Sequence, residues 1–427
     1  MLKTKKILEI IRAGGLDTTF AFLYGSSERD FLPQRERYQT LLEEFMHRYG
    51  DRDAILVSAP GRVEIGGNHT DHQHGCVLAA AIQLDVIAVV SPNADLTIRL
   101  KSRGFSEDRL TLDSLDPRKN EKNTSIALIR GVAAGIKDLG GHIGGFDACT
   151  TSDVLKGSGI SSSAAFEVLV AAIFNQLYND GIISHTDEAK IGQFAENVYF
   201  GKPSGLMDQM ASATGGFVGI DFKDPKNPVI TPIEFDFSKT GYTLCIVDTG
   251  GSHADLTNEY AAIRQEMCAV AACFGKDYLR EVDEEQFIAD IPAIRKQCGD
   301  RAVLRALHFF ADTKRAEEEK EALQKGDFEA FLRLVNESGR SSFMYNQNAY
   351  AISDPAFQGI SVGLALTERF LNGIGACRLQ GGGFGGTIQV FLPTGMLADY
   401  KREIEKIFGE GSCKAMRIRS DGSRTVE

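Results

Sequence analysis

The chain has 427 residues and a mass of 46.6 kDa, which suits two domains that share an interface, on a scale of roughly 150 residues per domain. Hydrophobic residues make up 43% and charged residues 25%, which excludes a globally disordered or fibrous protein. The 47 basic and 58 acidic side chains give a net charge of -11, which disfavours nucleic-acid binding through general neutralisation of phosphates. Any phosphate that the protein binds must therefore be held by a local site.

The eight cysteines are spread along the chain without a CxxC pair, which favours reduced thiols over a disulfide framework or a zinc site. Residues 1–15 resemble a signal peptide only briefly, because Glu9 and Arg12 interrupt the apolar stretch. No segment reaches the ~20 apolar residues of a membrane span. The sequence thus predicts a cytoplasmic protein, expected to be a monomer, with neither a membrane nor a nucleic-acid partner.

Residues 1 to about 50 show helical periodicity, with glycines at 14, 15 and 50 as stops. From Ala54 the pattern changes to the strand-like runs AILVSA, VIAVVS and LTIRL. The first run leads directly into PGRVEIGGNHTDHQHG, a segment dense in glycine and histidine. We therefore expect a strand that delivers this loop to a site.

Further helices and a strand are predicted beyond residue 150. Apolar residues after GSGISSSAA predict a long buried helix, and IGQFAENVYFG predicts a helix that ends at Gly201 and Pro203. The segment SGLMDQMASATGG predicts another helix, capped by Ser204. Long amphipathic helices of a second domain are predicted over about 258–275 and 300–334, and a strand is expected after the glycine cluster at 381–386.

The segment GSGISSSAA has the composition of a phosphate cradle. Gly157 and Gly159 let the backbone approach an anion closely, and three serines follow at a helix start, where the helix dipole favours negative charge. An ordinary serine-capped helix after a flexible turn is the alternative. The lysine of a Walker A loop is missing, so the common P-loop class is not supported.

Two other clusters leave alternatives open. The glycines of GGGFGG permit main-chain contact with a ligand, but a bulged hairpin tip would show the same residues, and the strand that follows argues against a dinucleotide fingerprint. The thirteen residues from Arg62 to His74 suit hydrogen bonding to a polyhydroxyl ligand, although a metal site or a solvated loop would also fit. The polar members of this loop are Arg62, Glu64, Asn68, His69, Thr70, Asp71, His72 and His74.

The order of these motifs resembles a known family. APGRVEIGGNHTDHQHGCVLAAAI is similar to the galactokinase signature, while GSGISSSAA and RLQGGGFGG resemble the second and third motifs of the GHMP small-molecule kinases. GKPSGLMDQ resembles the galactokinase segment that carries the catalytic aspartate. The resemblance covers residues 37–427 and implies an α+β protein: a ribosomal-protein-S5-like domain over 37–213, a ferredoxin-like domain over 214–427, and a helical extension over 1–36 outside the likeness.

The resemblance implies a role for each matching residue. Asp208 and Arg62 take the catalytic positions, and Ser162 and Glu196 take the magnesium positions. ATP phosphates are expected at Gly157, Ser158, Gly159, Ile160, Ser161, Ser162 and Ser163. Sugar contacts are expected from Asn68, His69, Asp71, Gly205, Asp208 and Tyr260.

The spacing of the two implied carboxylates also makes physical sense. Glu196 lies twelve residues before Asp208, and the interruption at 201–205 between two predicted helices can bring both to one phosphate. Three positions depart from the family pattern. Asn68 replaces the glutamate associated with the C6 hydroxyl, His72 replaces a tyrosine, and Leu155 replaces a proline.

These implications predict an enzyme that uses ATP and Mg²⁺ to phosphorylate the C1 hydroxyl of galactose. A kinase for a related sugar such as galacturonate or arabinose is the first alternative, which Asn68 favours. A non-catalytic sugar sensor is the second, and the presence of Arg62, Glu196 and Asp208 argues against it. Which serine of 161–163 touches the metal stays open at this point.

Overall fold

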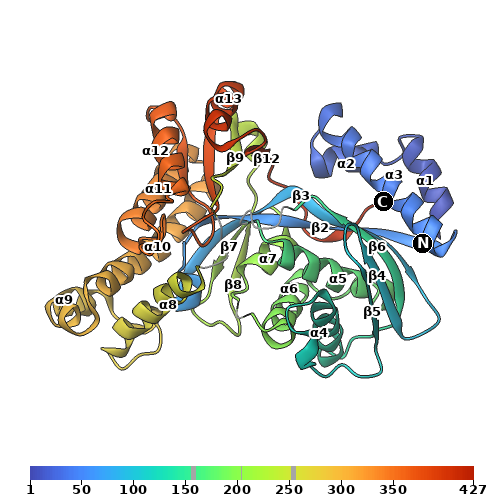
Figure 1. Ribbon diagram of the computed structural model, residues 1–427, viewed down its shortest axis with the longest axis horizontal. Helices are drawn as coiled ribbons and strands as arrows, with labels where there is room; N and C mark the ends of the chain where they lie inside the picture. Colours follow the sequence, from blue (N-terminus) through green and yellow to red (C-terminus); the bar gives the residue numbers. More distant parts are fainter. Residues whose placement is uncertain (155–159, 203, 252–255) are drawn as a thin grey trace.

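The computed structural model describes residues 1–154, 160–202, 204–251 and 256–427, whose strands form two separate sheets (Figure 1). The mixture of helices and two sheets confirms the expected α+β class. None of the described helices is both long and apolar enough to cross a membrane.

The larger sheet has the strand order β1-β2-β3-β6-β4-β5, and β7, β8 and β13 join it off this path. Every pairing is antiparallel except that of β4 with β6. Its strands are β1 Leu2–Lys3, β2 Asp53–Gly66, β3 Cys76–Pro92, β4 Thr97–Ser102, β5 Glu107–Thr111, β6 Phe146–Ser152, β7 Phe217–Asp221, β8 Val229–Ile233 and β13 Arg424–Thr425. Because β7, β8 and β13 belong to it, this sheet extends across the predicted domain boundary at 213/214.

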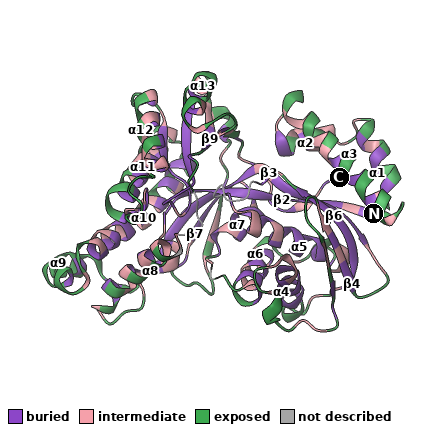
Figure 2. Cartoon of the chain, in the orientation of Figure 1, coloured by how far each residue is buried: buried purple, intermediate pink, exposed green. Residues whose placement is uncertain are grey.

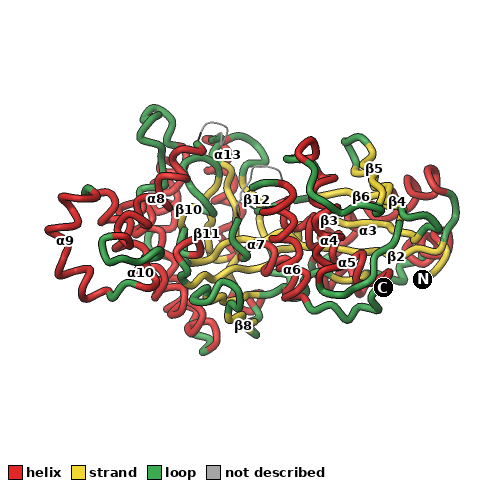
Figure 3. The backbone as a smooth tube through the Cα atoms, turned by 90° about the horizontal axis from the view of Figure 1, so that it is seen from below, coloured by secondary structure: helices red, strands yellow, loops and turns green. Residues whose placement is uncertain are grey.

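Helices cover both faces of this sheet (Figure 1). One face carries α4 Ser125–Asp138, α5 Ser162–Tyr178, α6 His185–Phe194 and α7 Met207–Thr214, which Figure 3 shows in front of the strands when seen from below. The other face carries α1 Thr4–Arg12, α2 Asp17–Tyr24 and α3 Glu28–Tyr49, as the periodicity of residues 1–50 predicts. Buried Phe20, Tyr38 and Leu41 anchor this helical extension on the sheet.

The smaller sheet is antiparallel with the order β10-β11-β9-β12. Its strands are β9 Tyr242–Asp248, β10 Ala376–Leu379, β11 Thr387–Pro393 and β12 Cys413–Met416. The accompanying helices are α8 Thr257–Ala272, α9 Glu284–Cys298, α10 Asp300–Gln324, α11 Phe328–Ser341, α12 Gly359–Leu371 and α13 Leu397–Phe408. The glycine cluster therefore forms the connection of the β10–β11 hairpin, followed by the predicted strand.

Two local predictions were wrong. The amphipathic stretch 300–334 is not one helix, because the chain turns at Gly326, whose φ of +71° is a left-handed conformation that favours glycine, and α11 begins two residues later. Ser204 does not cap α7, since the N-cap position is Leu206 and no side chain makes a capping hydrogen bond there. Ser204 instead bonds to Asn197 in the preceding turn.

The hairpin of β2 and β3 positions the site. Both strands are buried along most of their length (Figure 2) and run toward the smaller sheet and α10. Residues 67–75 connect them at the end nearest those elements. As a result, the loop dense in glycine and histidine lies where the two parts of the molecule meet.

Candidate active site

Arg62 and Asp208 form a bidentate ion pair. Arg62 Nε lies 2.6 Å from Asp208 Oδ1, and Arg62 Nη2 lies 2.7 Å from Asp208 Oδ2. Arg62 comes from β2 and Asp208 from the first turn of α7, so the pair joins a rigid strand to a helix N-terminus. Burial raises the pKa of Asp208, but the Arg62 guanidinium and the Ser161 hydroxyl together lower it by more than burial raises it. The pKa of Asp208 therefore lies below the ordinary value. Asp208 is therefore a carboxylate at neutral pH.

Ser161 connects the predicted phosphate loop to this pair. Its Oγ donates to Asp208 Oδ2 at 2.6 Å, and its backbone has a φ of +55° at the N-cap of α5. Such a left-handed conformation is uncommon for a residue other than glycine. It persists where the surrounding structure fixes it, and such residues cluster at functional sites. The carbonyl of Ile160 also accepts from Arg62 N at 3.2 Å. The end of the loop is thus fixed on β2, whereas Gly157, Ser158 and Gly159 lie outside the described residues.

A second cluster surrounds Glu196, which lies in the π-helical turn Ala195–Phe200 after α6. Glu196 Oε1 accepts from Ser163 Oγ at 3.1 Å and from Lys202 Nζ at 2.9 Å, and Glu196 Oε2 accepts from Gln209 Nε2 at 3.0 Å. Since π-turns often occur at functional sites, this geometry agrees with the predicted role of the residue. Glu196 and Asp208 lie on consecutive helical segments, as the spacing predicted.

Glu167 adds a second acid to this cluster. Gln209 Nε2 donates to Glu167 Oε2 at 2.8 Å as well as to Glu196, so one amide bridges two carboxyl groups. Burial, and then the charge of Glu196, raise the pKa of Glu167 well above its usual range. Glu167 Oε1 has no hydrogen-bond partner among the described residues. Glu167 is therefore the neutral member of the pair, and Glu196 is the member that forms a salt bridge with Lys202.

Asp71 and Gly205 meet within reach of the charge of Asp208. A Cβ on Gly205 would lie 2.2 Å from Asp71 Oδ2, so a glycine is needed for this close approach. His72 N donates to Asp71 Oδ1 at 2.8 Å. Burial raises the pKa of Asp71, the His69 ring opposes this shift, and the charge of Asp208 adds to it. The influence of Asp208 shows that the two carboxyl groups belong to one electrostatic site.

His69 and Tyr260 hold the glycine loop of the β10–β11 hairpin. His69 Nε2 lies 2.9 Å from the carbonyl oxygen of Gly382, and Tyr260 Oη donates to the carbonyl of Gly383 at 3.0 Å. The two rings face each other with centroids 6.5 Å apart. The loop that carries His69, helix α8 and the glycine cluster are therefore in contact with one another.

Asn68 is fully buried at the base of the same loop. Its Nδ2 donates to Glu64 Oε1 at 2.8 Å and to the carbonyl of Gly381 at 2.7 Å, and its Oδ1 accepts from Asn348 Nδ2 at 2.8 Å. The Asn68 amide nitrogen thus donates two hydrogen bonds and its oxygen accepts one, all within the protein. The sugar contact expected from the sequence stays a prediction, and these bonds favour a role behind the loop.

Lys202, Gln209 and Glu167 are residues of the site that sequence reasoning missed. Lys202 carried a usable signal, because it is a cation in the turn between the two predicted acids Glu196 and Asp208. Glu167 and Gln209 lie inside apolar helical patterns and gave none. The alternative of a metal in the histidine loop is not supported, since the described residues contain no group of three or more His, Cys, Asp or Glu side chains that could hold one.

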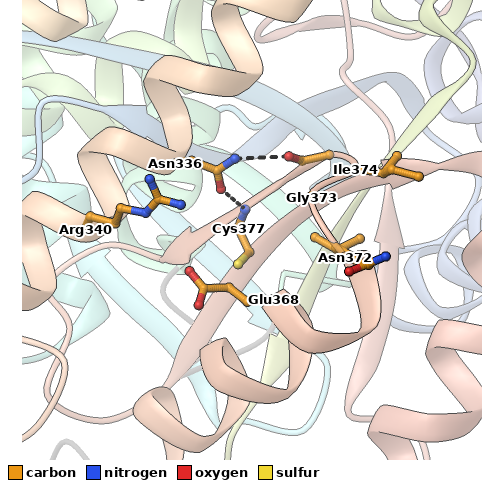
Figure 4. A pocket seen from close by; sticks show the side chains of 9 residues that line it. Asn336, Arg340, Glu368, Asn372, Gly373, Ile374 and Cys377 are labelled. Atoms are coloured by element: carbon orange, nitrogen blue, oxygen red, sulfur yellow. Dashed lines mark hydrogen bonds between the residues drawn. The ribbon is translucent and has the colours of Figure 1, made fainter.

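Two pockets lie away from this site. One, with a volume of about 280 Å³, is in the smaller-sheet part of the molecule, where Arg340 and Glu368 line it from α11 and α12 (Figure 4). Its floor is rigid because Asn336 Nδ2 donates to the carbonyl of Gly375 and its Oδ1 accepts from Cys377 N, both at 3.0 Å. The other, of about 420 Å³, is lined by residues that include Arg280 and Phe310. Neither is lined by a predicted site residue.

Similarity to known proteins defines the class of this protein. The GHMP kinases N terminal domain matches residues 127–216, which include the serine loop and Asp208. A crystal structure of mevalonate kinase aligns with a TM-score of 0.58 at 15% identity, covering 85% of this chain and 99% of that chain. A crystal structure of Lactococcus lactis galactokinase complexed with galactose aligns with a TM-score of 0.74 at 23% identity, covering 90% of this chain and 98% of that one. The two-domain fold is that of a GHMP kinase.

Sequence similarity then gives the family within this class. The galactokinase galactose-binding signature matches residues 43–92. A galactokinase of Streptomyces coelicolor is 32% identical over 381 residues, which are 89% of this chain and 95% of the relative. A human galactokinase is 29% identical over 90% of this chain and 95% of its own length. The chain belongs to the galactokinase family.

Proposed function

We propose that the protein transfers the γ-phosphoryl group of ATP to the C1 hydroxyl of galactose, giving galactose 1-phosphate and ADP. The observation that carries the proposal is the position of Asp208. It is an ionised carboxylate held by Arg62 and Ser161. Its charge acts on Asp71, which contacts Gly205, and Gln209, the next residue of α7, donates to Glu196. An acceptor hydroxyl and a phosphate can thus meet at one charged group.

Asp208 acts mainly by orienting the acceptor. A carboxylate whose pKa is lowered is a weak base, so early removal of the hydroxyl proton is unfavourable. Phosphoryl transfer through a loose transition state needs little nucleophile activation and depends on alignment and charge. We therefore assign Asp208 to aligning the C1 hydroxyl and accepting its proton late. Arg62 keeps that carboxylate ionised and opposes the charge that develops on the phosphoryl group.

The oxygen donors around Glu196 fit Mg²⁺. This ion prefers hard oxygen ligands and is commonly bound by one or two carboxylates together with substrate phosphates. Glu196 supplies a carboxylate and Ser163 a hydroxyl 3.1 Å from it, which favours Ser163 over the predicted Ser162 as the second protein ligand. When bound, the ion supplies charge neutralisation on the phosphates. The loop from Ile160 to Ser163 would contact ATP at the start of α5.

The sugar would lie between the loop at 67–75 and α7. We assign its hydroxyl groups to His69, Asp71 and Tyr260, with the backbone at Gly205 and the Asp208 carboxylate beside C1. The residues of this set come from α7, α8 and the connecting loops, so both parts of the molecule must be in place for binding. Sugar and ATP are the expected small-molecule partners, and the monomeric state and cytoplasmic location stay predictions.

The test is a panel of sugars assayed through ADP release. Galactose, galacturonate, arabinose and N-acetylgalactosamine are compared at saturating Mg-ATP, with an ATP-only reaction as background. We expect the highest kcat/KM on galactose. A higher value on galacturonate or arabinose would contradict the galactose assignment while leaving the kinase assignment intact. Galactose binding by calorimetry without any ADP release would contradict catalysis and favour a sensor.

A further inference from the structure

Glu64 has a buried carboxylate that the proposed reaction does not use. It projects from β2 at the junction with the smaller sheet, and its side chain is almost inaccessible. One oxygen, Oε1, accepts both from Arg378 Nη2 at 2.8 Å and from Asn68 Nδ2 at 2.8 Å. Arg378 is itself fully buried on β10. A single carboxylate oxygen therefore joins the β2 strand, the sugar-side loop and the smaller sheet.

The same strand segment is fixed through its backbone. Arg378 Nη1 donates to the carbonyl of Ile65 at 2.5 Å, and Gln389 Nε2 donates to the carbonyl of Glu64 at 2.8 Å. Arg62 precedes Glu64 by two residues in an unbroken register with β3, so both side chains lie on the same face of the strand. Holding Glu64 in place consequently fixes the position from which Arg62 reaches Asp208.

Asn68 extends this connection into the loop. Its backbone N donates to Asp312 Oδ2 at 2.8 Å, and its carbonyl lies 2.8 Å from His308 Nε2, both on α10. Its side-chain amide joins Glu64 to the carbonyl of Gly381. Asn68 is thus attached on every side, and the next residue along the chain is the predicted sugar ligand His69.

Arg378 makes its direct salt bridge with Glu64. Asp312 forms its own direct pair with Arg315, while the charge of Arg378 acts on Asp312 without a salt bridge between them. Glu319 is fully buried, neither of its oxygens has a partner among the described residues, and burial followed by the charge of Asp312 raises its pKa well above the usual range, so it is neutral. Glu64 is therefore the carboxylate in direct contact with Arg378. The family pattern has a glutamate where this chain has Asn68, and Asn68 touches Glu64.

We propose that Glu64, Asn68 and Arg378 act as one positioning unit, in which Glu64 carries the single negative charge and Asn68 carries its position to the sugar loop. Neither Glu64 nor Asn68 contacts the C6 group of the sugar. The inference rests on the proposed kinase activity for its readout. A second carboxylate at 68 would oppose Glu64 across one hydrogen bond, and an amide at 64 would leave buried Arg378 without a carboxylate in direct contact.

The test is a double-mutant cycle of Asn68→Glu, Glu64→Asn and the double variant, which returns the unit to one carboxylate. Each single change is expected to lower kcat/KM for galactose by about 100-fold, because a displacement of about 1 Å at positioned groups can cost that much. The double variant is expected to recover at least ~10-fold relative to either single variant, because coupled residues are not additive. Losses that simply multiply in the double variant would overturn the inference.

Two further arms separate positioning from a direct contact with the sugar and from a general loss of stability. On the four-sugar panel, Asn68→Glu should lose all sugars to the same degree, whereas a selective loss of galacturonate would show that residue 68 reads C6. Asp147→Asn is the control, since it removes the buried carboxylate on β6 that pairs with Arg52 and Arg99, none of them a predicted site residue, and should lower the melting temperature without changing the KM for galactose. If wild type turned over no sugar, the proposed function would fail, and coupling would be read from chemical denaturation of the same four proteins.

Discussion

Asp85 and Asp208 are both paired with arginine, and they differ in what surrounds the pair. Asp85 on β3 is completely buried and accepts from Arg37 at 2.7 Å, from Arg419 at 3.1 Å, from Tyr24 Oη at 2.7 Å and from Ser58 Oγ. Asp208 has one arginine and one serine, and 28% of its side chain remains exposed. The first carboxylate is saturated by protein groups, whereas the second keeps an accessible edge.

A lowered pKa therefore does not identify a catalytic acid in this chain. Burial raises the pKa of both carboxyl groups, and the arginines bring both below the ordinary value. What distinguishes Asp208 is the partial exposure of its side chain, together with its proximity to the Glu196 cluster and to the Asp71–Gly205 contact. Asp85 instead ties α2, α3 and the C-terminal residues to the sheet, which gives the helical extension a structural task.

The largest expected effect follows from Asp208→Asn. The amide keeps the shape but loses the charge, so kcat should fall by about 10²-fold or more while galactose binds within about tenfold of wild type. Steady-state kinetics and calorimetry measure the two quantities. A variant that kept more than about a tenth of the wild-type kcat would remove Asp208 from the chemistry.

Asp85→Asn should have the opposite profile. Arg419 would remain buried without its paired carboxylate and Arg37 would keep only Asp153, so we expect the free energy of unfolding to fall by about 3–5 kcal/mol with an unchanged KM for galactose at low temperature. Denaturant titration measures the loss. Asp153→Asn is the control, because that residue also pairs with Arg37 at 3.0 Å but is partly exposed and should matter little. Equal losses in the two variants would argue against a special role for Asp85.

Gly205→Ala tests the sugar side of the site. The added Cβ would lie 2.2 Å from Asp71 Oδ2 and must displace that carboxylate, so KM for galactose should rise about tenfold or more. Gly395→Ala serves as the control, since no atom lies within 4 Å of a Cβ there. If KM stayed at the wild-type value in Gly205→Ala, the predicted sugar role of Asp71 would be unsupported.

Glu196→Ala tests the phosphate side. Removing the carboxylate should raise the Mg²⁺ concentration needed for half-maximal rate by roughly tenfold, while galactose affinity is retained. Titration of the rate with Mg²⁺ at fixed ATP gives the value. Ser162→Ala and Ser163→Ala are compared in the same assay, and a larger shift for Ser162→Ala would restore the assignment made from the sequence.

The smallest effect concerns pH. The folded-state pKa of Asp208 lies below its unfolded value, so its charge is present above that range and is lost only as the pH falls through the lowered pKa. We expect no acidic limb from Asp208 in the kcat profile above about pH 5. Rates measured in overlapping buffers test this. An acidic limb that disappears in Asp208→Glu or moves with it would show that Asp208 titrates at higher pH.

Sequence motifs predicted the parts of the site that neighbouring residues determine. The order of Arg62, the serine loop, Glu196 and Asp208 could be read because each lies in a short segment with its own turn chemistry, and the interruption at 201–205 implied that two acids meet. The pairing of Glu64 with Arg378 could not be read, since 314 positions separate them and only tertiary packing brings them together. The same holds for Arg37 and Arg419 around Asp85. Continuous amphipathic periodicity likewise concealed the turn at Gly326.

The most direct test of phosphoryl transfer to the C1 hydroxyl is to locate the phosphate on the product. Wild-type protein is incubated with Mg-ATP and galactose labelled with ¹³C at C1, and the product is observed by ³¹P NMR. The proposed alignment of the C1 hydroxyl by Asp208 predicts a phosphorus that couples both to the labelled carbon and to the proton on that carbon, with one ADP formed per sugar phosphate. A phosphorus that does not couple to the C1 proton, which would place the phosphate on another hydroxyl, or the absence of any sugar phosphate would contradict the proposed reaction.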